Sequence, residues 1–116
     1  MPRFGDGMLT RRQIDDTAEY VLSLSGKSGD QAAAGRGKPV YAENCVACHG
    51  EDGKGTRDVG APNLADAIWL YGASKPDVVK SIETGRGGIM PAWLGRLDAE
   101  TIKKLALYVH SLGGGQ

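Results

Sequence analysis

The sequence predicts an all-α protein, and three observations support this fold class. Apolar residues recur at helical spacing, capping residues precede the expected helices, and no apolar stretch alternates over the length of a strand. A chain of 116 residues is long enough for one ordinary domain and too short for two of average size. We therefore expect helices that pack around a single core.

The first expected helix, within residues 1–26, belongs to an internal repeat. Met1-Pro2-Arg3-Phe4 returns as Met90-Pro91-Ala92-Trp93, and each copy is followed by the same apolar pattern. The paired helix residues are Ile14 and Ile102, Ala18 and Ala106, Tyr20 and Tyr108, Val21 and Val109, Ser23 and Ser111, and Leu24 and Leu112. Each copy therefore consists of a methionine loop and a closing helix.

The second expected helix follows a small, polar stretch at residues 25–30, which has the composition of a linker. Ser28 and Gln31 can form a capping box, and the alanines at 32, 33 and 34 favour a helix that continues toward Cys45. Alternatively, the stable helix begins near Pro39, whose ring removes a backbone donor.

Two further helices are expected in the C-terminal half. The capping pair Ser74 and Asp77 predicts a short helix from about Pro76 to Thr84, which Gly85 ends. Asp98 can cap the final helix. The apolar residues on one face of this helix, which we expect to pack inward, are Ile102, Leu105, Ala106, Val109 and Leu112.

Residues Cys45-Val46-Ala47-Cys48-His49 form the attachment signature of a c-type haem. In this chemistry two thiols bond the porphyrin vinyl groups and the adjacent imidazole binds the iron. Cysteines three positions apart lie on one side of a helical turn, and the histidine that follows is held beneath the ring. The sequence therefore predicts one covalent haem c bound by Cys45, Cys48 and His49, and no catalytic residue.

Other interpretations of the two cysteines explain less. A four-thiolate zinc site needs a second pair, and the chain has only two cysteines. A buried disulfide or a thioredoxin-like dithiol leaves the adjacent histidine without a role, and no βαβ pattern surrounds the motif.

The two axial positions of the iron are assigned to His49 and Met90. Met90 follows a glycine loop, which allows close approach to a ring, and precedes Pro91, which stiffens the backbone. His110, Met1, Met8 and a lone lysine are weaker candidates, because His110 lies on a helix and the two methionines lie in the N-terminal tail. The carbonyl of Pro62 is a candidate to orient His49, although spacing alone favours a simple turn there.

Three more residues are candidates for the wall of the haem pocket. Trp69, Tyr71 and Arg86 can donate hydrogen bonds to the haem propionates, which are costly to bury unpaired. The alternatives are that both aromatic residues belong to the core and that Arg86 lies in solvent.

The domain interpretation follows from the repeat and the single attachment motif. Residues 1–26 are interpreted as the tail of a preceding haem domain that is otherwise absent, 27–34 as a linker and helix start, and 35–116 as a complete monohaem domain. The net charge of zero gives no reason to expect nucleic acid as a partner. No apolar run is long enough to cross a membrane and no signal peptide is present, so we expect the chain as given to be soluble.

Residues 35–113 resemble the class I c-type cytochromes. Gly37, Tyr41 and Cys45 match the small residue, aromatic residue and first cysteine of that family at intervals of four. The resemblance implies the class I fold, in which the first and last helices cross, here Gly37 against Leu105 and Tyr108.

The same resemblance covers Pro62-Asn63-Leu64, which matches the family segment whose proline carbonyl accepts a hydrogen bond from the ligand histidine. It implies that Pro62 takes this role, in place of the simple turn that spacing favours.

More narrowly, the whole chain is similar to the dihaem subunit of cbb3-type cytochrome c oxidase. The segments that carry this similarity are Ala61-Pro62-Asn63-Leu64, Ile68-Trp69-Leu70-Tyr71-Gly72 and Gly88-Ile89-Met90-Pro91-Ala92-Trp93. The similarity implies one-electron relay in aerobic respiration, with no enzymatic activity of the piece itself. It also implies other haem-containing oxidase subunits and small donor cytochromes as partners. The full-length protein would be anchored to the inner membrane, with this piece on the periplasmic side.

A second function stays open at this point. If Met90 dissociates, the open iron would bind a gas or react with peroxide. A peroxide-reactive site needs a histidine or arginine above the iron, and His110 is the only histidine besides His49.

Overall fold

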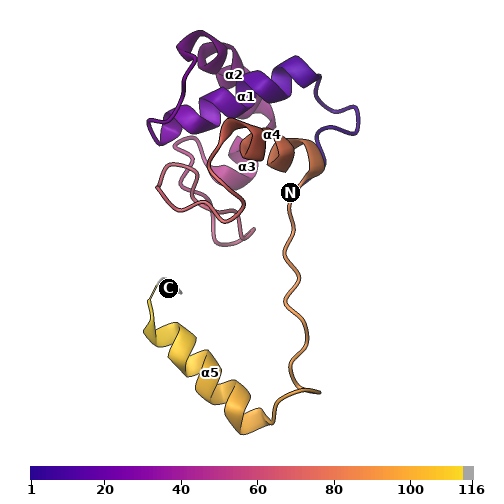
Figure 1. The fold of residues 1–116 in the computed structure, drawn as a ribbon, viewed down its shortest axis with the longest axis vertical. Helices are drawn as coiled ribbons and strands as arrows, with labels where there is room; N and C mark the ends of the chain where they lie inside the picture. The colour runs from indigo at the N-terminus through magenta and orange to yellow at the C-terminus, as the bar shows by residue number, and fades with distance from the viewer. Residues whose placement is uncertain (114–116) are drawn as a thin grey trace.

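The structure, a computed structural model, describes residues 1–113, which form five helices and no strand. The helices are α1 (Arg11–Leu24), α2 (Gln31–Asn44), α3 (Val46–His49), α4 (Lys75–Thr84) and α5 (Ala99–Ser111). Figure 1 shows α1 to α4 gathered into one body, with α5 standing apart from it. The predicted all-α class is confirmed.

Side chains cap the N-terminal ends of the long helices. Thr10 and Gln13 form a capping box before α1, and Ser74 and Asp77 form one before α4. Asp98 accepts a backbone hydrogen bond at the start of α5. The predicted caps of α4 and α5 are therefore confirmed.

The start of α2 differs from the predicted one. Asp30 caps the helix, and the hydroxyl of Ser28 donates a hydrogen bond of 2.7 Å to the buried carboxylate of Glu19. Because Glu19 takes this hydroxyl, the expected capping box between Ser28 and Gln31 does not form. The helix runs through Pro39, so the alternative start near that residue is wrong.

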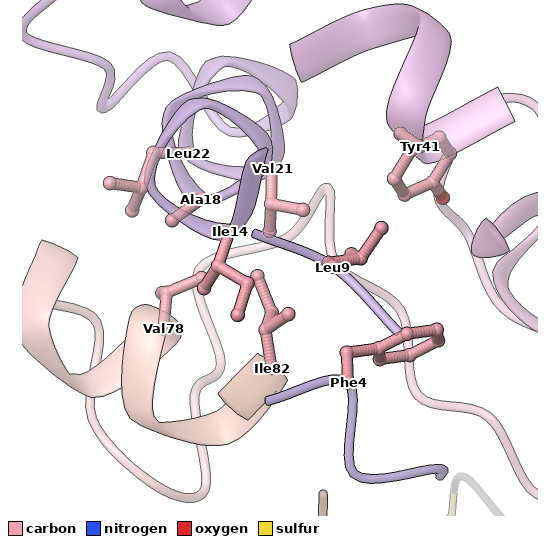
Figure 2. Packing of buried hydrophobic residues seen from close by; sticks show 9 residues of the cluster. All are labelled: Phe4, Leu9, Ile14, Ala18, Val21, Leu22, Tyr41, Val78 and Ile82. Atoms are coloured by element: carbon pink, nitrogen blue, oxygen red, sulfur yellow. The ribbon is translucent and has the colours of Figure 1, made fainter. Parts of the chain in front are cut away.

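The hydrophobic core lies between α1, α2 and α4 and includes the loop that precedes α1. Figure 2 shows Val78 and Ile82 of α4 facing Ile14 of α1. Each such side chain contributes about 1.5–3 kcal/mol when it is fully buried. The core cluster consists of Phe4, Leu9, Ile14, Ala18, Val21, Leu22, Tyr41, Val78 and Ile82. The N-terminal segment thus supplies most of the core around the motif.

The closest approach of two helices occurs where α1 crosses α2 at Gly37. A Cβ atom on Gly37 would overlap the carbonyl of Asp16 and approach the backbone nitrogen of Thr17. The expectation that Gly37 meets Leu105 and Tyr108 is therefore wrong in this arrangement. Gly37 does allow two helices to cross closely, but the helix that crosses α2 there is α1 and not α5.

Two acidic residues of α1 form ion pairs with neighbouring segments. The guanidinium of Arg36 donates two hydrogen bonds to the Asp16 carboxylate, from Nη2 at 2.7 Å and from Nε at 2.9 Å. This hydrogen bonding lowers the pKa of Asp16. Burial alone would raise the pKa of Glu19, but hydrogen bonds from Ser28 and Lys75 outweigh it and the pKa is lowered. Both carboxylates are therefore held ionised against α2 and α4.

The last helix packs against no other helix of residues 1–113. Residues 85–98 form a mostly irregular segment that leads α5 away from the body. Figure 1 shows this segment descending from the end of α4. Leu105, Tyr108, Val109 and Leu112 are all exposed. The prediction that this apolar face packs inward is wrong here, because α1 occupies the face of α2 that it would cover.

Substitution of Gly37 tests the helix crossing. Gly37→Ala should lower the free energy of unfolding by about 1–3 kcal/mol, because the new methyl group has no room beside Asp16. The matched control is Gly35→Ala in the same helix, where the methyl group would meet open space and should stabilise by about 0.5–1 kcal/mol. Urea unfolding followed by circular dichroism measures both, and equal effects of the two variants would contradict the crossing.

Acid should weaken the packing of α1. Asp16 and Glu19 have folded-state pKa values below the ordinary 3.8 and 4.5, so they stabilise the fold above those values and lose this effect as the pH falls below them. The double variant Asp16→Asn/Glu19→Gln should therefore be less stable than the parent at neutral pH, and the gap should close below about pH 4. Urea titrations over a pH series measure this gap.

The control for the acid series is Glu51→Gln/Asp58→Asn. Both residues are exposed and neither forms an ion pair within residues 1–113. This pair should leave the stability nearly unchanged across the series. If the difference in unfolding free energy between the parent and Asp16→Asn/Glu19→Gln stays constant into strong acid, the two carboxylates are not its cause.

Candidate haem-binding site

The attachment motif forms a single helical turn directly after α2. Cys45 is the C-terminal capping residue of α2, and its carbonyl accepts hydrogen bonds from the backbone nitrogens of Cys48 at 3.2 Å and His49 at 2.9 Å. All three side chains line one cavity of about 650 Å³, a size within the range of small-molecule sites. The predicted grouping of the two thiols and the imidazole on one turn is present.

The imidazole of His49 is oriented by the loop that follows the motif. Its Nδ1 atom lies 3.1 Å from the carbonyl oxygen of Pro62. Because a carbonyl only accepts, this contact assigns the proton to Nδ1 and leaves the lone pair of Nε2 available for a metal. The hydrogen bond that the family resemblance implied for Pro62 is therefore present, in place of a simple turn.

The loop from 50 to 64 is folded tightly enough to hold Pro62 in this place. The backbone nitrogen of Gly55 donates to the carbonyl of His49 at 2.8 Å, and the hydroxyl of Thr56 donates to the carbonyl of Cys48 at 2.8 Å. Gly55 has a φ of +79°, and a Cβ atom there would overlap the carbonyls of Ala61 and Pro62. The close approach of these backbones therefore requires glycine.

Tyr41 connects the helix crossing to the motif. Its ring lies 5.0 Å from that of Tyr20 in α1, centroid to centroid, and its hydroxyl donates to the carbonyl of Gly50 at 2.9 Å. Burial raises the pKa of Tyr41 to about 12, so the hydroxyl stays a neutral donor. Gly50, which directly follows His49, is thus hydrogen-bonded to a core residue.

The first thiol of the motif lacks the electrostatics of a redox-active cysteine. Both thiols are free, and burial raises the pKa of Cys45 to about 11. A thioredoxin-like site works with a thiol whose pKa is lowered, since the thiolate is the nucleophile. The environment of Cys45 therefore does not favour disulfide exchange.

The three predicted wall residues Trp69, Tyr71 and Arg86 line the same cavity. The indole N–H of Trp69 is buried and has no hydrogen-bond partner, and the guanidinium of Arg86 lies 4.4 Å from the centre of the Tyr71 ring. An unpaired donor and a cation at the wall match the carboxylates that a haem carries. The residues present therefore fit the group that the motif predicts.

The candidate sulfur ligands are placed differently from the prediction. Met90 lies in the segment between α4 and α5, is 82% exposed and does not line the cavity. Met1, its counterpart in the repeat, does line the cavity, and its amino group donates to the carbonyl of Arg86 at 3.0 Å. Met8 and His110 lie outside the cavity lining. The repeat, which pairs Met1 with Met90, is the signal in the sequence that could have placed Met1 at the cavity.

A helical body with a Cys-x-x-Cys-His turn, a carbonyl-oriented histidine and a large cavity beside it has the site of a c-type cytochrome. The comparison with known families is more specific. A family model described as "Cytochrome C oxidase, cbb3-type, subunit III" matches residues 32–109, and the chain belongs to this family.

Curated relatives agree with the family assignment. The chain is 53% identical over 117 residues to the cbb3-type cytochrome c oxidase subunit CcoP of Cereibacter sphaeroides, and 55% identical over 121 residues to CcoP of Azospirillum brasilense. It is 53% identical over 116 residues to the subunit FixP of Sinorhizobium medicae. Each match covers all of this chain and 40–41% of the relative. Within residues 1–113, no helix combines the length and apolar character needed to cross a bilayer.

Substitution of Gly55 tests the support of His49. Gly55→Ala should displace the carbonyl of Pro62, and the imidazole would then lose the acceptor that raises its basicity. We expect a lower yield of chain carrying covalent haem and a higher reduction potential in the part that carries it. Mass spectrometry and a spectroscopic redox titration measure the two quantities.

Gly60→Ala is the matched control, because Gly60 also has a positive φ, of +64°, but has no atoms near its missing Cβ. Both variants carry the backbone strain of an alanine in this conformation. Only Gly55→Ala should change the haem yield and the potential. Equal changes in both variants would show that strain, and not the contact with Pro62, is responsible.

Proposed function

We propose that this chain carries one haem c and transfers single electrons through it, as part of the dihaem subunit of a cbb3-type cytochrome c oxidase. The observation that carries the proposal is the contact between His49 Nδ1 and the carbonyl of Pro62, within the turn that also bears both cysteines. Membership of the cbb3 subunit III family supports it. When bound, the haem supplies a one-electron couple between Fe(III) and Fe(II).

The residues of the chain have distinct roles in this proposal. Cys45 and Cys48 would hold the porphyrin edge, and His49 would bind the iron through Nε2 while the carbonyl of Pro62 keeps the imidazole from rotating. A ligand held in one orientation in both oxidation states favours rapid electron exchange, because little rearrangement accompanies the transfer.

Two lining residues of the same cavity would hold the propionates. Trp69 offers a buried indole N–H without a partner, and Arg86 offers a cation next to Tyr71. Hydrogen bonds from both would offset the cost of enclosing the propionate charge. They would also hold the haem in one rotational position.

We propose Met90 as the second axial ligand, on its glycine loop and following proline. In the arrangement described, Met1 lines the cavity and Met90 does not, so ligation by Met90 requires residues 85–98 to fold back over the pocket. A thioether ligand and an apolar pocket both favour the ferrous iron, so the potential should lie above that of a bis-histidine haem.

The wider setting of the proposal follows the names of the relatives. By itself the piece would act as a relay and not as an enzyme. Its partners would be other haem-containing oxidase subunits and small donor cytochromes, on the periplasmic side of the inner membrane, with an anchor elsewhere in the longer protein. The relatives' names favour this relay over a gas-binding or peroxide-reactive module.

Removal of the methionine sulfur tests the axial assignment. Met90→Ala should abolish the near-infrared band of thioether-bound ferric haem and should give a ferrous haem that binds carbon monoxide at once. The parent should show the band and bind carbon monoxide slowly. Spectra of both oxidation states, with and without the gas, measure these properties.

Met8→Ala is the control, since Met8 is 58% exposed and lies outside the cavity lining. It should behave as the parent does. A sulfur band that survives in Met90→Ala would exclude Met90 and leave Met1 as the ligand. A parent chain whose mass lacks the added haem would overturn the proposed function itself.

A further inference from the structure

Tyr41 binds the backbone on both sides of the attachment motif. Its own carbonyl accepts a hydrogen bond of 2.8 Å from the backbone nitrogen of Cys45, the first residue of the motif. Its hydroxyl donates a hydrogen bond of 2.9 Å to the carbonyl of Gly50, the residue that follows His49. The first bond is an ordinary helical one that any residue could make, whereas the second requires a side chain with a hydroxyl at this place.

The hydroxyl satisfies a carbonyl that the short helix α3 leaves without a partner of its own. The last carbonyls of a helix have no acceptor role inside it and need donors from elsewhere. The loop after the motif supplies the donors for the carbonyls of Cys48 and His49. The carbonyl of Gly50 instead receives its shortest hydrogen bond from α2, through Tyr41.

The contact between Tyr41 and Gly50 is enclosed and short. Tyr41 is 1% exposed, so water does not replace the bond if the hydroxyl is removed. The backbone nitrogen of Gly53 also donates to the carbonyl of Gly50, but at 3.3 Å. The hydroxyl of Tyr41 would lie 3.7 Å from a Cβ atom placed on Gly53, so it meets the loop at this turn.

The turn at Gly53 is joined to the loop residues that orient the imidazole. The carbonyl of Gly53 accepts a hydrogen bond of 2.7 Å from the backbone nitrogen of Leu64. Leu64 lies two residues after Pro62, whose carbonyl contacts Nδ1 of His49 at 3.1 Å. A continuous series of hydrogen bonds therefore leads from the hydroxyl of Tyr41 to the imidazole, and every member of it lies within residues 41–64.

Packing alone does not account for the hydroxyl. The residues of the core cluster around Tyr41 are apolar, and a phenylalanine would fill nearly the same volume without carrying a polar atom into the core. The position one helical turn before Cys45 needs only an aromatic ring to contribute to this cluster. The hydroxyl is explained by its acceptor, the carbonyl of Gly50.

We propose that Tyr41 is a positioning residue for His49, because its hydroxyl fixes the turn at residues 50–53 and, through that turn, the carbonyl of Pro62. The effect on the loop does not depend on haem. The effect on an iron ligand rests on the proposed function, since only a bound haem gives His49 that role.

Tyr41→Phe removes the hydroxyl and keeps the ring. Hydrogen exchange of the full chain, followed by NMR, should show the amides of Gly53 and Leu64 exchanging about tenfold faster than in the parent. The amides of α4, which lies outside this series of bonds, should keep the rates of the parent. A side chain that only fills the core would not produce this local difference.

The chain that carries haem gives a second measurement. A looser contact between His49 and Pro62 leaves the imidazole less basic, and a less basic ligand favours the ferrous iron. The reduction potential of Tyr41→Phe should therefore shift upward from that of the parent, in a spectroscopic redox titration.

Tyr20→Phe is the matched control. The ring of Tyr20 lies against that of Tyr41, with centroids 5.0 Å apart, but its hydroxyl makes no hydrogen bond within residues 1–113. The same loss of a phenol should leave the amides of Gly53 and Leu64 and the reduction potential unchanged.

The parent provides a measurement that does not depend on the folding of a variant. The phenolic proton of Tyr41 should exchange slowly with water and should show a nuclear Overhauser effect to the amide of Gly53. A proton that exchanges freely would overturn the proposal, even if Tyr41→Phe did not fold.

The remaining outcomes separate the proposal from its alternatives. Amides of the loop that keep their rates in Tyr41→Phe overturn it, and so does faster exchange in all helices alike, which would make Tyr41 a core residue only. A loosened loop with an unchanged potential would overturn the connection to His49. A parent chain without attached haem would contradict the proposed function, whereas the loop amides and the phenolic proton would still test the role of Tyr41.

Discussion

The rest of the structure depends on the close crossing of α1 over Gly37 of α2. Only a residue without a Cβ atom allows the two backbones to approach this far, and the approach brings Tyr20 against Tyr41. Tyr41 in turn holds the carbonyl of Gly50, the residue directly after His49. The position of the His49 imidazole is therefore connected to the helix crossing through one buried ring and one hydrogen bond.

The ion pairs of α1 contribute more to the choice of partner than to net stability. Asp16 and Glu19 are both buried, and the desolvation of a buried carboxylate offsets much of the gain from its partner. A helix without acidic residues at these positions would leave Arg36 and Lys75 without ion-pair partners. Since α5 carries a lysine and a leucine at the matching positions, Arg36 and Lys75 distinguish two helices whose apolar faces are nearly the same.

Sequence alone predicted the features that depend on neighbouring residues. The capping pairs before α4 and α5 and the single turn that bears Cys45 and His49 follow from local spacing. The contact of His49 with Pro62 needed the family resemblance, because spacing alone favoured a turn. The partner of Gly37 could not be predicted, since most apolar residues of the helix are identical in both copies of the repeat. The charged residues that favour α1, Asp16 and Glu19, pair with residues on other helices. Ser28 was predicted to form a capping box with Gln31. That prediction was wrong because the hydroxyl of Ser28 binds the buried Glu19, which lies nine positions earlier on another helix.

The two halves of the candidate site are built in different ways. The cysteines, His49 and the carbonyl of Pro62 all lie within one stretch of twenty or so residues, whose backbone hydrogen bonds join the loop directly to the motif. Covalent attachment can therefore proceed on a locally folded segment. The candidate sulfur ligands instead lie on separate segments, Met1 before α1 and Met90 between α4 and α5. A covalently attached haem would keep its place on this stretch, and only the sulfur ligand would depend on packing between distant segments. The two halves of the candidate site therefore depend on different interactions: local backbone hydrogen bonds for the attachment half, and packing between distant segments for the sulfur half.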